Sequence, residues 1–160
     1  KEIGLFSYLP ATPLGAQEAN AFLEARMNFT EAVSSVYRNY VTFSGRARRS
    51  EYWWWALFSI IAAIVIAIIE SALGLGQGMM SSGGGGFEAS YNGGPLSIVW
   101  SLANLLPALA VGARRLHDTD RSGWWLLIAL VPLIGAIVLI VFFATKGTTG
   151  PNRFGEDPIR

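Results

Sequence analysis

The sequence predicts an all-α membrane protein with about three transmembrane helices, preceded by an N-terminal amphipathic helix or helices. Charged residues make up 14% of the 160-residue chain, whereas soluble proteins contain about 25%. Three long runs contain no charged side chain, and two of them open with adjacent tryptophans. Because Trp and Tyr favour the boundary between membrane and water, these positions fit the ends of membrane spans.

The composition also excludes several classes of protein. The chain has 12% aromatic residues, which is atypical of disordered proteins, and it has no cysteine for a disulfide scaffold or a thiolate metal site. A net charge of +1 argues against a protein that works by coating nucleic acid. Pumps and ion-coupled carriers usually place ionisable groups inside the membrane, and the three runs contain none.

The three uncharged runs predict the membrane spans. They cover residues 53–69, 96–113 and 124–144 and contain 17, 18 and 21 residues. A helix needs about 20 mostly apolar residues to cross the hydrocarbon core. With their flanks, the runs predict a transmembrane domain over residues 53–145, with spans at about 52–73, 96–113 and 124–145. Buried helices of a soluble protein are the alternative, which runs of this length disfavour.

Pro132 and Gly135 lie in the middle of the third run and leave two paths open for the chain. Proline is tolerated in a membrane helix where neighbours satisfy the freed carbonyl, so we expect a single kinked crossing. A re-entrant turn at these residues is the alternative. It would return the tail, residues 146–160, to the side on which the run begins.

Lysine and arginine near the span ends set the expected orientation. The connection 70–95 has neither residue, and the connection 114–123 has three arginines. Four arginines lie within about 15 residues before the first span, namely Arg38, Arg46, Arg48 and Arg49. We therefore expect the N-terminal region and the connection 114–123 in the cytoplasm and the connection 70–95 outside. Three full crossings place the tail outside, against the preference of its own basic residues.

Two segments before the first span have helical patterns. Residues 1–27 are an N-terminal extension in which Thr12-Pro13 is typical of a helix start. Residues 28–52 are predicted to hold an amphipathic helix, begun by a capping box of Asn28 and Glu31, and then the Arg-rich cytoplasmic segment. Such helices lie at the membrane interface or pack on another protein, and the pattern fits both.

Nine glycines make residues 74–95 a predicted flexible outer loop. A phosphate-binding loop needs Gly-Lys-Ser/Thr at a strand-to-helix turn, and this segment has no lysine. Low complexity therefore accounts for its composition.

Six arginines beside the span ends are candidate contacts for lipid, an anion or a protein partner. Basic residues at this level attract anionic lipid, and a dedicated anionic ligand or a protein partner is the alternative. These residues are Arg46, Arg48, Arg49, Arg114, Arg115 and Arg121.

His117, Asp118 and Asp120 lie between the arginines of the second connection. We expect structural ion pairing here, because Arg–carboxylate pairs fix short loops rigidly. An anion or lipid-headgroup site is one alternative, and catalysis or metal binding is another. One histidine with two carboxylates is a poor ligand set for a transition metal, and Ser122 lacks an oxyanion hole for a hydrolase triad. The sequence thus predicts no catalytic, cofactor-binding or metal-binding residue.

Small and amide side chains inside the runs indicate where helices pack. Ala63 with Ala67, and Ala108 with Gly112, form small-xxx-small pairs that let helices approach closely. Asn104 is expected to hydrogen-bond across helices, because an unpaired amide is costly in the membrane.

Three stretches together resemble the domain of unknown function 805 family of small bacterial inner-membrane proteins. They read NYVTFSGRARRSEYWW at 39–54, RRLHDTDRSGWW at 114–125 and KGTTGPNRFGEDP at 146–158. The resemblance covers about residues 28–158 and implies a multi-pass membrane domain with no established activity, cofactor or catalytic residue. The longer Gly-rich loop and residues 1–26, which precede Met27, depart from the family pattern.

Together these features predict a non-enzymatic integral inner-membrane protein that acts as an accessory subunit, or as an assembly or stabilising factor, of a larger membrane complex. Its expected partners are membrane lipids and that complex, with no nucleic acid, cofactor or small-molecule substrate. An anionic-lipid or anion-binding module, or a small channel-like oligomer, is the alternative function. An intramembrane enzyme that uses His117 and Asp118 is a third hypothesis.

Overall fold

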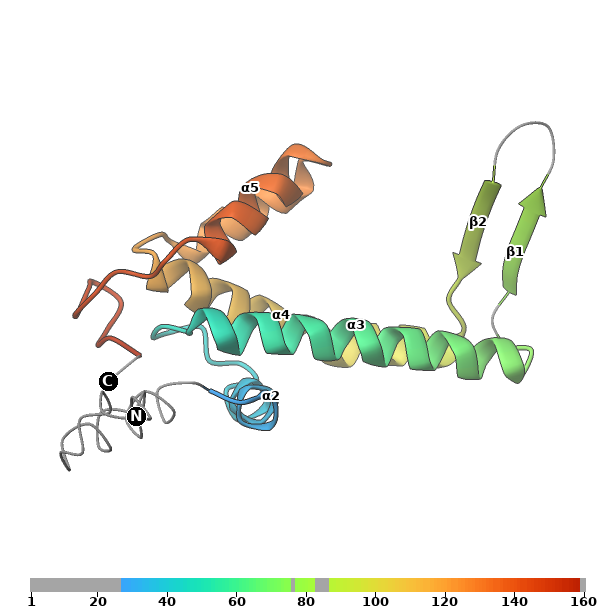
Figure 1. Cartoon of the computed structure of the whole chain (residues 1–160), viewed down its shortest axis with the longest axis horizontal. Coiled ribbons are helices and arrows are strands. Elements are labelled where there is room, and N and C mark those ends of the chain that lie inside the picture. The colour runs from blue at the N-terminus through green and yellow to red at the C-terminus, as the bar shows by residue number, and fades with distance from the viewer. Residues whose placement is uncertain (1–26, 76, 83–86, 159–160) are drawn as a thin grey trace, which may run out of the picture.

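The computed structural model describes residues 27–75, 77–82 and 87–158 (Figure 1). Two helices are long and apolar and a third is shorter, so the predicted helical membrane fold class is confirmed. The elements follow in the order α2 (Phe29–Arg38), α3 (Arg49–Ala72), β1 (Gln77–Ser82), β2 (Phe87–Asn92), α4 (Pro95–Asp118), the 3-10 helix η1 (Gly123–Leu130) and α5 (Ile134–Ala144). Residues 1–26, with the helix expected there, lie outside the described residues.

Helix α2 begins at the predicted capping box. The Asn28 side chain accepts a hydrogen bond from the N–H of Glu31 at 2.9 Å, and the Glu31 carboxylate accepts one from the N–H of Asn28 at 3.0 Å. The helix buries Ala32 and Val36, and Val36 packs with Trp55 of α3. The apolar face of α2 is therefore covered by the chain's own long helices.

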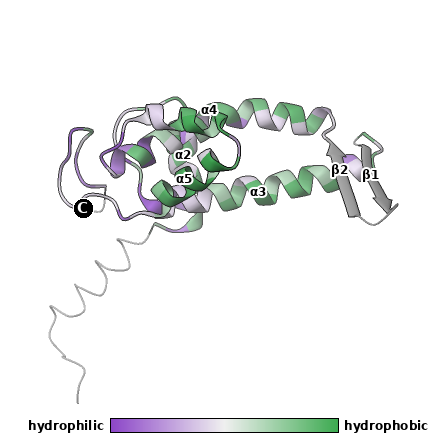
Figure 2. Cartoon of the chain, turned by 90° about the horizontal axis from the view of Figure 1, so that it is seen from above, coloured by the Kyte–Doolittle hydropathy of each residue, from purple (hydrophilic) through white to green (hydrophobic). Residues whose placement is uncertain are grey.

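Helices α3 and α4 run antiparallel between two ends of different character (Figure 2). We call the end that holds Arg46, Asp118 and residues 146–158 the polar end, and the opposite end carries the β-strands. Each helix has 24 residues, or about 36 Å of length, which exceeds a hydrocarbon core of about 30 Å. In the most apolar 18-residue stretch of each helix, only 11% is buried for α3 and 33% for α4. Exposed apolar surface of this extent is typical of contact with lipid or protein.

The buried core sits at the polar end. One cluster holds Val36, Ala47, Trp55 and Val111. A second cluster holds Leu116, Leu139 and Phe143, which come from α4 and α5. The packing that fixes the fold therefore surrounds the segments in which the two Arg-rich stretches lie.

Glu70 ties the far end of α3 to the start of α4. Its carboxylate accepts hydrogen bonds from the N–H of Gly94 at 3.1 Å, the N–H of Ser97 at 3.0 Å and the Ser97 hydroxyl. The residue is 0% exposed, and Gly94 at the N-cap of α4 has no side chain to cap the helix. Glu70 therefore caps α4 from another helix and places a negative charge at the positive end of its dipole.

The Gly-rich connection differs from the predicted flexible loop. Strands β1 and β2 pair as an antiparallel hairpin, in a register that runs from Gln77 opposite Asn92 to Ser82 opposite Phe87. The hairpin projects from the end of the molecule opposite the tail (Figure 1). An isolated two-stranded hairpin is marginally stable in water, so this one contributes little to the stability of the fold.

The prediction of one kinked helix over residues 124–145 is wrong. Helix η1 ends at Leu130, and α5 begins at Ile134 and has 11 residues, or about 17 Å of length, too short to cross a membrane alone. The chain reverses between them, with Leu133 at a φ of +63°. Pro132 removes one backbone donor at this point, and a side chain at Gly135 would collide with the carbonyl of Ile128. These two residues let the arms turn and lie close together.

Both arms of this reversal meet the polar end. Gly123, at the start of η1, lies beside Ala113 and His117 of α4. After α5, the N–H of Thr148 donates to the carbonyl of Asp118 at 2.9 Å. The segment therefore returns to the end at which it starts, as the re-entrant alternative requires, and the tail lies on the same side as Arg46.

Candidate functional site

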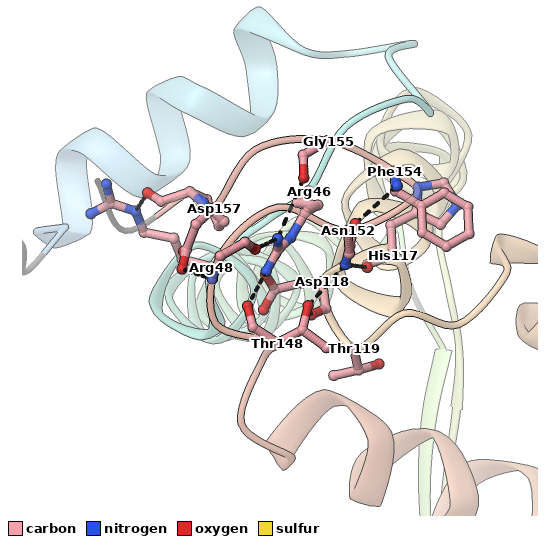
Figure 3. A network of polar contacts seen from close by, with 12 residues as sticks. Arg46, Arg48, His117, Asp118, Thr119, Thr148, Asn152, Phe154, Gly155 and Asp157 are labelled. Atoms are coloured by element: carbon pink, nitrogen blue, oxygen red, sulfur yellow. Dashed lines mark hydrogen bonds and ion pairs between the residues drawn. The ribbon is translucent and has the colours of Figure 1, made fainter.

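The two Arg-rich stretches and the tail converge at the polar end (Figure 3). Arg46 precedes α3, Asp118 ends α4, and Thr148 lies in the tail that follows α5. Short hydrogen-bonded paths connect all three. This arrangement makes the polar end the natural place to look for a site.

Asp118 is the centre of the polar end. Its Oδ1 accepts hydrogen bonds from Arg46 Nε at 3.0 Å and Arg46 Nη2 at 2.9 Å, and its Oδ2 accepts one from Arg115 Nη1. The side chains of Arg46, Asp118 and Arg115 are 1%, 6% and 0% exposed. A buried carboxylate between two guanidinium groups is held by geometry as well as charge.

Backbone carbonyls of the last segments occupy the remaining donors of these arginines. Arg46 donates to the carbonyl of Gly150 at 2.6 Å and to that of Thr148. Arg115 donates to the carbonyls of Phe143, at 3.0 Å, and Thr145. The guanidinium groups of Arg46 and Arg115 are thus used inside the fold and do not form an open anion site.

A second buried pair joins α2, α3 and α4. Arg114 Nη1 donates to Glu51 Oε1 at 2.9 Å, and the Ser35 hydroxyl donates to the same oxygen at 3.0 Å. Arg114 and Glu51 are 5% and 4% exposed. Two further nitrogens of Arg114, Nε and Nη2, have no hydrogen-bond partner within the part of the chain that the structure describes.

His117 does not take part in the ion pairing expected of it within the described ranges. Its Nδ1 lies 3.1 Å from the carbonyl oxygen of Gly45. Its ring stacks on that of Phe154, with centroids 3.9 Å apart and planes 3° from parallel. The Nδ2 of Asn152 donates to the His117 carbonyl at 2.9 Å. The His117 ring therefore contacts the Phe154 ring and the Gly45 carbonyl, whereas the sequence predicted contacts with carboxylates.

The outer charges are paired loosely or lie at the surface. Asp120 pairs with Arg153 at 3.1 Å, with side chains 47% and 62% exposed, so the pair contributes about 0–1 kcal/mol. Arg121 lies over the ring of Phe142 at 4.2 Å. Arg48 donates to the carbonyl of Pro158, and Arg49 is exposed. The six candidate arginines therefore divide between the interior and the surface and do not make one basic patch.

Asn104 hydrogen-bonds to the amphipathic helix α2. Its Oδ1 accepts a hydrogen bond from the Tyr37 hydroxyl of α2 at 2.9 Å, and its Nδ2 donates to the carbonyl of Trp100 at 2.9 Å. Burial raises the pKa of Tyr37, and the neighbouring Tyr40 raises it further. The hydroxyl therefore stays a neutral donor, and it anchors the amphipathic helix to α4.

The four residues of the two predicted small-xxx-small pairs, Ala63 with Ala67 and Ala108 with Gly112, have different surroundings. Gly112 is buried, and a side-chain carbon there would lie 3.2 Å from Leu126 of η1. Ala63 and Ala108 are exposed and Ala67 is half-buried. Close packing within the chain therefore explains Gly112 and leaves the Ala63–Ala67 pair on an outer face of α3.

Several buried residues were not identified from the sequence. Glu51, at the polar end, and Glu70, at the opposite end, are both buried, and each stands at an end of the first apolar run. A single carboxylate beside a long apolar run is the sequence pattern that could have identified them. The tail carbonyls belong to the backbone and therefore leave no pattern in the sequence. Within the described residues, no group of three or more His, Cys, Asp or Glu is placed to hold a metal ion.

Comparison with known proteins gives a family. The model of the family described as "Protein of unknown function (DUF805)" matches residues 40–156. The inner membrane protein YhaI of Escherichia coli K12 is 50% identical over 124 residues, which cover 78% of this chain and 92% of the relative. The inner membrane protein YhaH of the same strain is 45% identical over 123 residues, which cover 77% and 92%.

No solved structure matches the chain. The family match covers most of the chain and includes the polar end, from Arg46 to Phe154. The relatives are named as inner membrane proteins, in agreement with the two long apolar helices. The chain is a membrane protein and belongs to the DUF805 family.

Proposed function

We propose that this chain is a non-enzymatic inner-membrane protein that acts by association, as an accessory subunit or as an assembly or stabilising factor of a larger membrane complex. The way its groups are used supports this role. The arginines at the heart of the polar end are bonded to the chain's own carboxylates and carbonyls. The apolar faces of α3 and α4, in contrast, have little cover within the described residues.

One face of α3 carries the proposal. Ala63, Ala67 and Ser71 follow one another at intervals of four residues and so lie along one side of the helix. A shallow groove of about 540 Å³ runs past Ala67 and Ser71, with Ile64 and Ile68 as further walls. Close packing of small residues drives helix association in membranes, where the hydrophobic effect does not. This face therefore suits a helix of another membrane protein.

We further propose that α3 and α4 both cross the membrane, with the polar end in the cytoplasm. Every described Lys and Arg lies before α3 or at its first residue, in the last five residues of α4, or after α4, and the connection 70–95 has none. The re-entrant path of residues 123–145 adds Lys146 and Arg153 to the same side. It thereby removes the conflict with the positive-inside rule that three crossings would create.

Site-specific photocrosslinking tests the associative role. A photoreactive amino acid at Ala67 should give one discrete adduct with a second membrane protein, identified by mass spectrometry, and the same residue at Leu102 is the control. Leu102 is 67% exposed and lies on α4, so lipid adducts are expected there. The Ala67 adduct should disappear when Ala63 is changed to Phe, because the larger ring blocks close approach of the second helix.

Two outcomes would count against the accessory role. Adducts that join two copies of this chain would favour the channel-like oligomer instead. Lipid adducts alone at Ala67, with the same pattern as at Leu102, would show that this face of α3 has no protein partner.

A further inference from the structure

A second pocket lies apart from the ion pairs, on the side of α4 that faces η1. It has a volume of about 420 Å³, within the range of small-molecule sites. Its walls are largely apolar and include Leu109, Ala113 and Leu126, and its polar members are His117 and Ser122. Nothing in the associative role uses this pocket.

The His117 ring presents a hydrogen-bond acceptor to this pocket. A carbonyl can only accept, so the 3.1 Å contact of Nδ1 with the Gly45 carbonyl places the proton of the neutral ring on Nδ1. Nε2 is then a bare acceptor. It lies 3.5 Å from the point that a side-chain carbon on Gly123 would occupy, and Gly123 is itself part of the pocket wall.

None of the residues that the structure describes donates a hydrogen bond to Nε2. The stack with Phe154 and the bond to Gly45 prevent the ring from turning to find one elsewhere. A fixed acceptor at the edge of an apolar pocket therefore favours a ligand that brings its own donor.

The pocket has the polarity of an amphipathic molecule at a membrane surface. His117 lies in the last turn of α4 at the polar end, and Leu109 lies eight residues earlier, which is about 12 Å deeper along the helix. Leu126 and Leu127 of η1 face the same space. A ligand would thus have its polar group near His117 and its hydrocarbon body along α4 towards the membrane interior.

We propose that this pocket binds a lipid-like molecule with a single hydrocarbon chain and a hydroxyl group, whose hydroxyl donates a hydrogen bond to Nε2 of His117. The chain of the ligand lies against Leu109 and Leu126. A headgroup without a donor lacks the bond to Nε2 and binds more weakly. The pocket is separate from the α3 face, so the failure of either proposal leaves the other standing.

Photolabelling of the full chain in liposomes tests the site. The probes are hexadecanol with a diazirine in its chain and the methyl ether of the same compound, which has no donor. Labelling of pocket residues, mapped by mass spectrometry, should be roughly two- to tenfold greater with the alcohol, the range that one neutral hydrogen bond supports.

Matched variants separate the two parts of the site. H117F keeps an aromatic ring against Phe154 and removes Nε2, so labelling by the two probes should become equal. L109W fills the deep end and should reduce labelling by both probes, whereas L105W should not. Leu105 is 52% exposed and lies about one turn from Leu109 outside the pocket wall.

The experiment that could overturn the proposal needs only the unaltered protein. Equal labelling by the alcohol and the ether would show that Nε2 does not select the ligand. Adducts spread evenly along α3 and α4, without enrichment at Leu109 or Leu126, would show bulk lipid only. Neither result depends on whether H117F folds.

Discussion

Asp118 is the residue at which three segments distant in sequence meet. Its carboxylate bonds to Arg46, which precedes it by 72 residues, and to Arg115 of its own helix. A side-chain carbon on Gly147 would overlap the carboxylate, so the tail backbone packs directly against Asp118. Loss of this one charge would leave two buried guanidinium groups without a counter-ion.

Asp118→Asn should therefore destabilise the fold strongly. Removing one partner of a buried ion pair costs about 3–5 kcal/mol, which thermal unfolding of the detergent-solubilised protein would measure. Asp120→Asn is the matched control, because its pair with Arg153 is exposed and is worth about 0–1 kcal/mol. Similar losses in both variants would contradict the central role of Asp118.

Single residues also show which contacts could be predicted from the sequence and which could not. The presence of ion pairs around Asp118 followed from local composition, but the choice of Arg46 did not, because the two residues come together only when α3 and α4 are packed. The carbonyl acceptors of Gly150 and Phe143 are available in every residue and so give no pattern. His117 was grouped with the carboxylates by proximity in sequence, whereas its ring neighbour is in the tail.

At the scale of elements, local signals were sufficient where the deciding contact is local. The capping box of α2 lies within four residues, and the uncharged runs locate α3 and α4. Helix α4 nevertheless continues past its run to Asp118, through residues that were expected in the connection 114–123. Hydropathy could not decide the path of residues 124–145, because a crossing helix and a re-entrant pair have the same composition. The deciding contact, Gly135 against Ile128, exists only after the chain has turned.

Gly135→Ala should disrupt this re-entrant pair. The added carbon meets the carbonyl of Ile128, so η1 and α5 must separate and the tail loses its position on Asp118. Limited proteolysis should then cut residues 146–158 faster than in the unaltered protein. Ala136→Ser, at the next and exposed position, should leave the rate unchanged, and resistance of both variants would argue against the tight turn.

On the scale of the whole molecule, charge is segregated along the long axis. The polar end holds the ion pairs and the tail, and the flanks of α3 and α4 between the two ends are apolar (Figure 2). The proposed topology, two crossings and one re-entrant segment, would place all of the charges of the polar end on one side of the membrane. The family supports a membrane protein, and the sidedness is open to a direct test.

Cysteine labelling should reveal the sidedness, because the chain has no natural cysteine. In intact spheroplasts, a membrane-impermeant maleimide should label Ser90→Cys in the Gly-rich connection but not Thr149→Cys in the tail. Thr149→Cys should react after the membrane is permeabilised. Labelling of both positions in intact spheroplasts would restore three crossings and place the tail outside.

The dependence of Arg46 on the tail also sets an order of assembly. The long helices are translated before residues 146–158, so they can form while the Arg46 guanidinium is still without its carbonyl partners. The polar end can close only when residues 146–158 have left the ribosome. A nascent chain halted before Thr148 would therefore expose the Arg46 guanidinium, which the finished fold conceals.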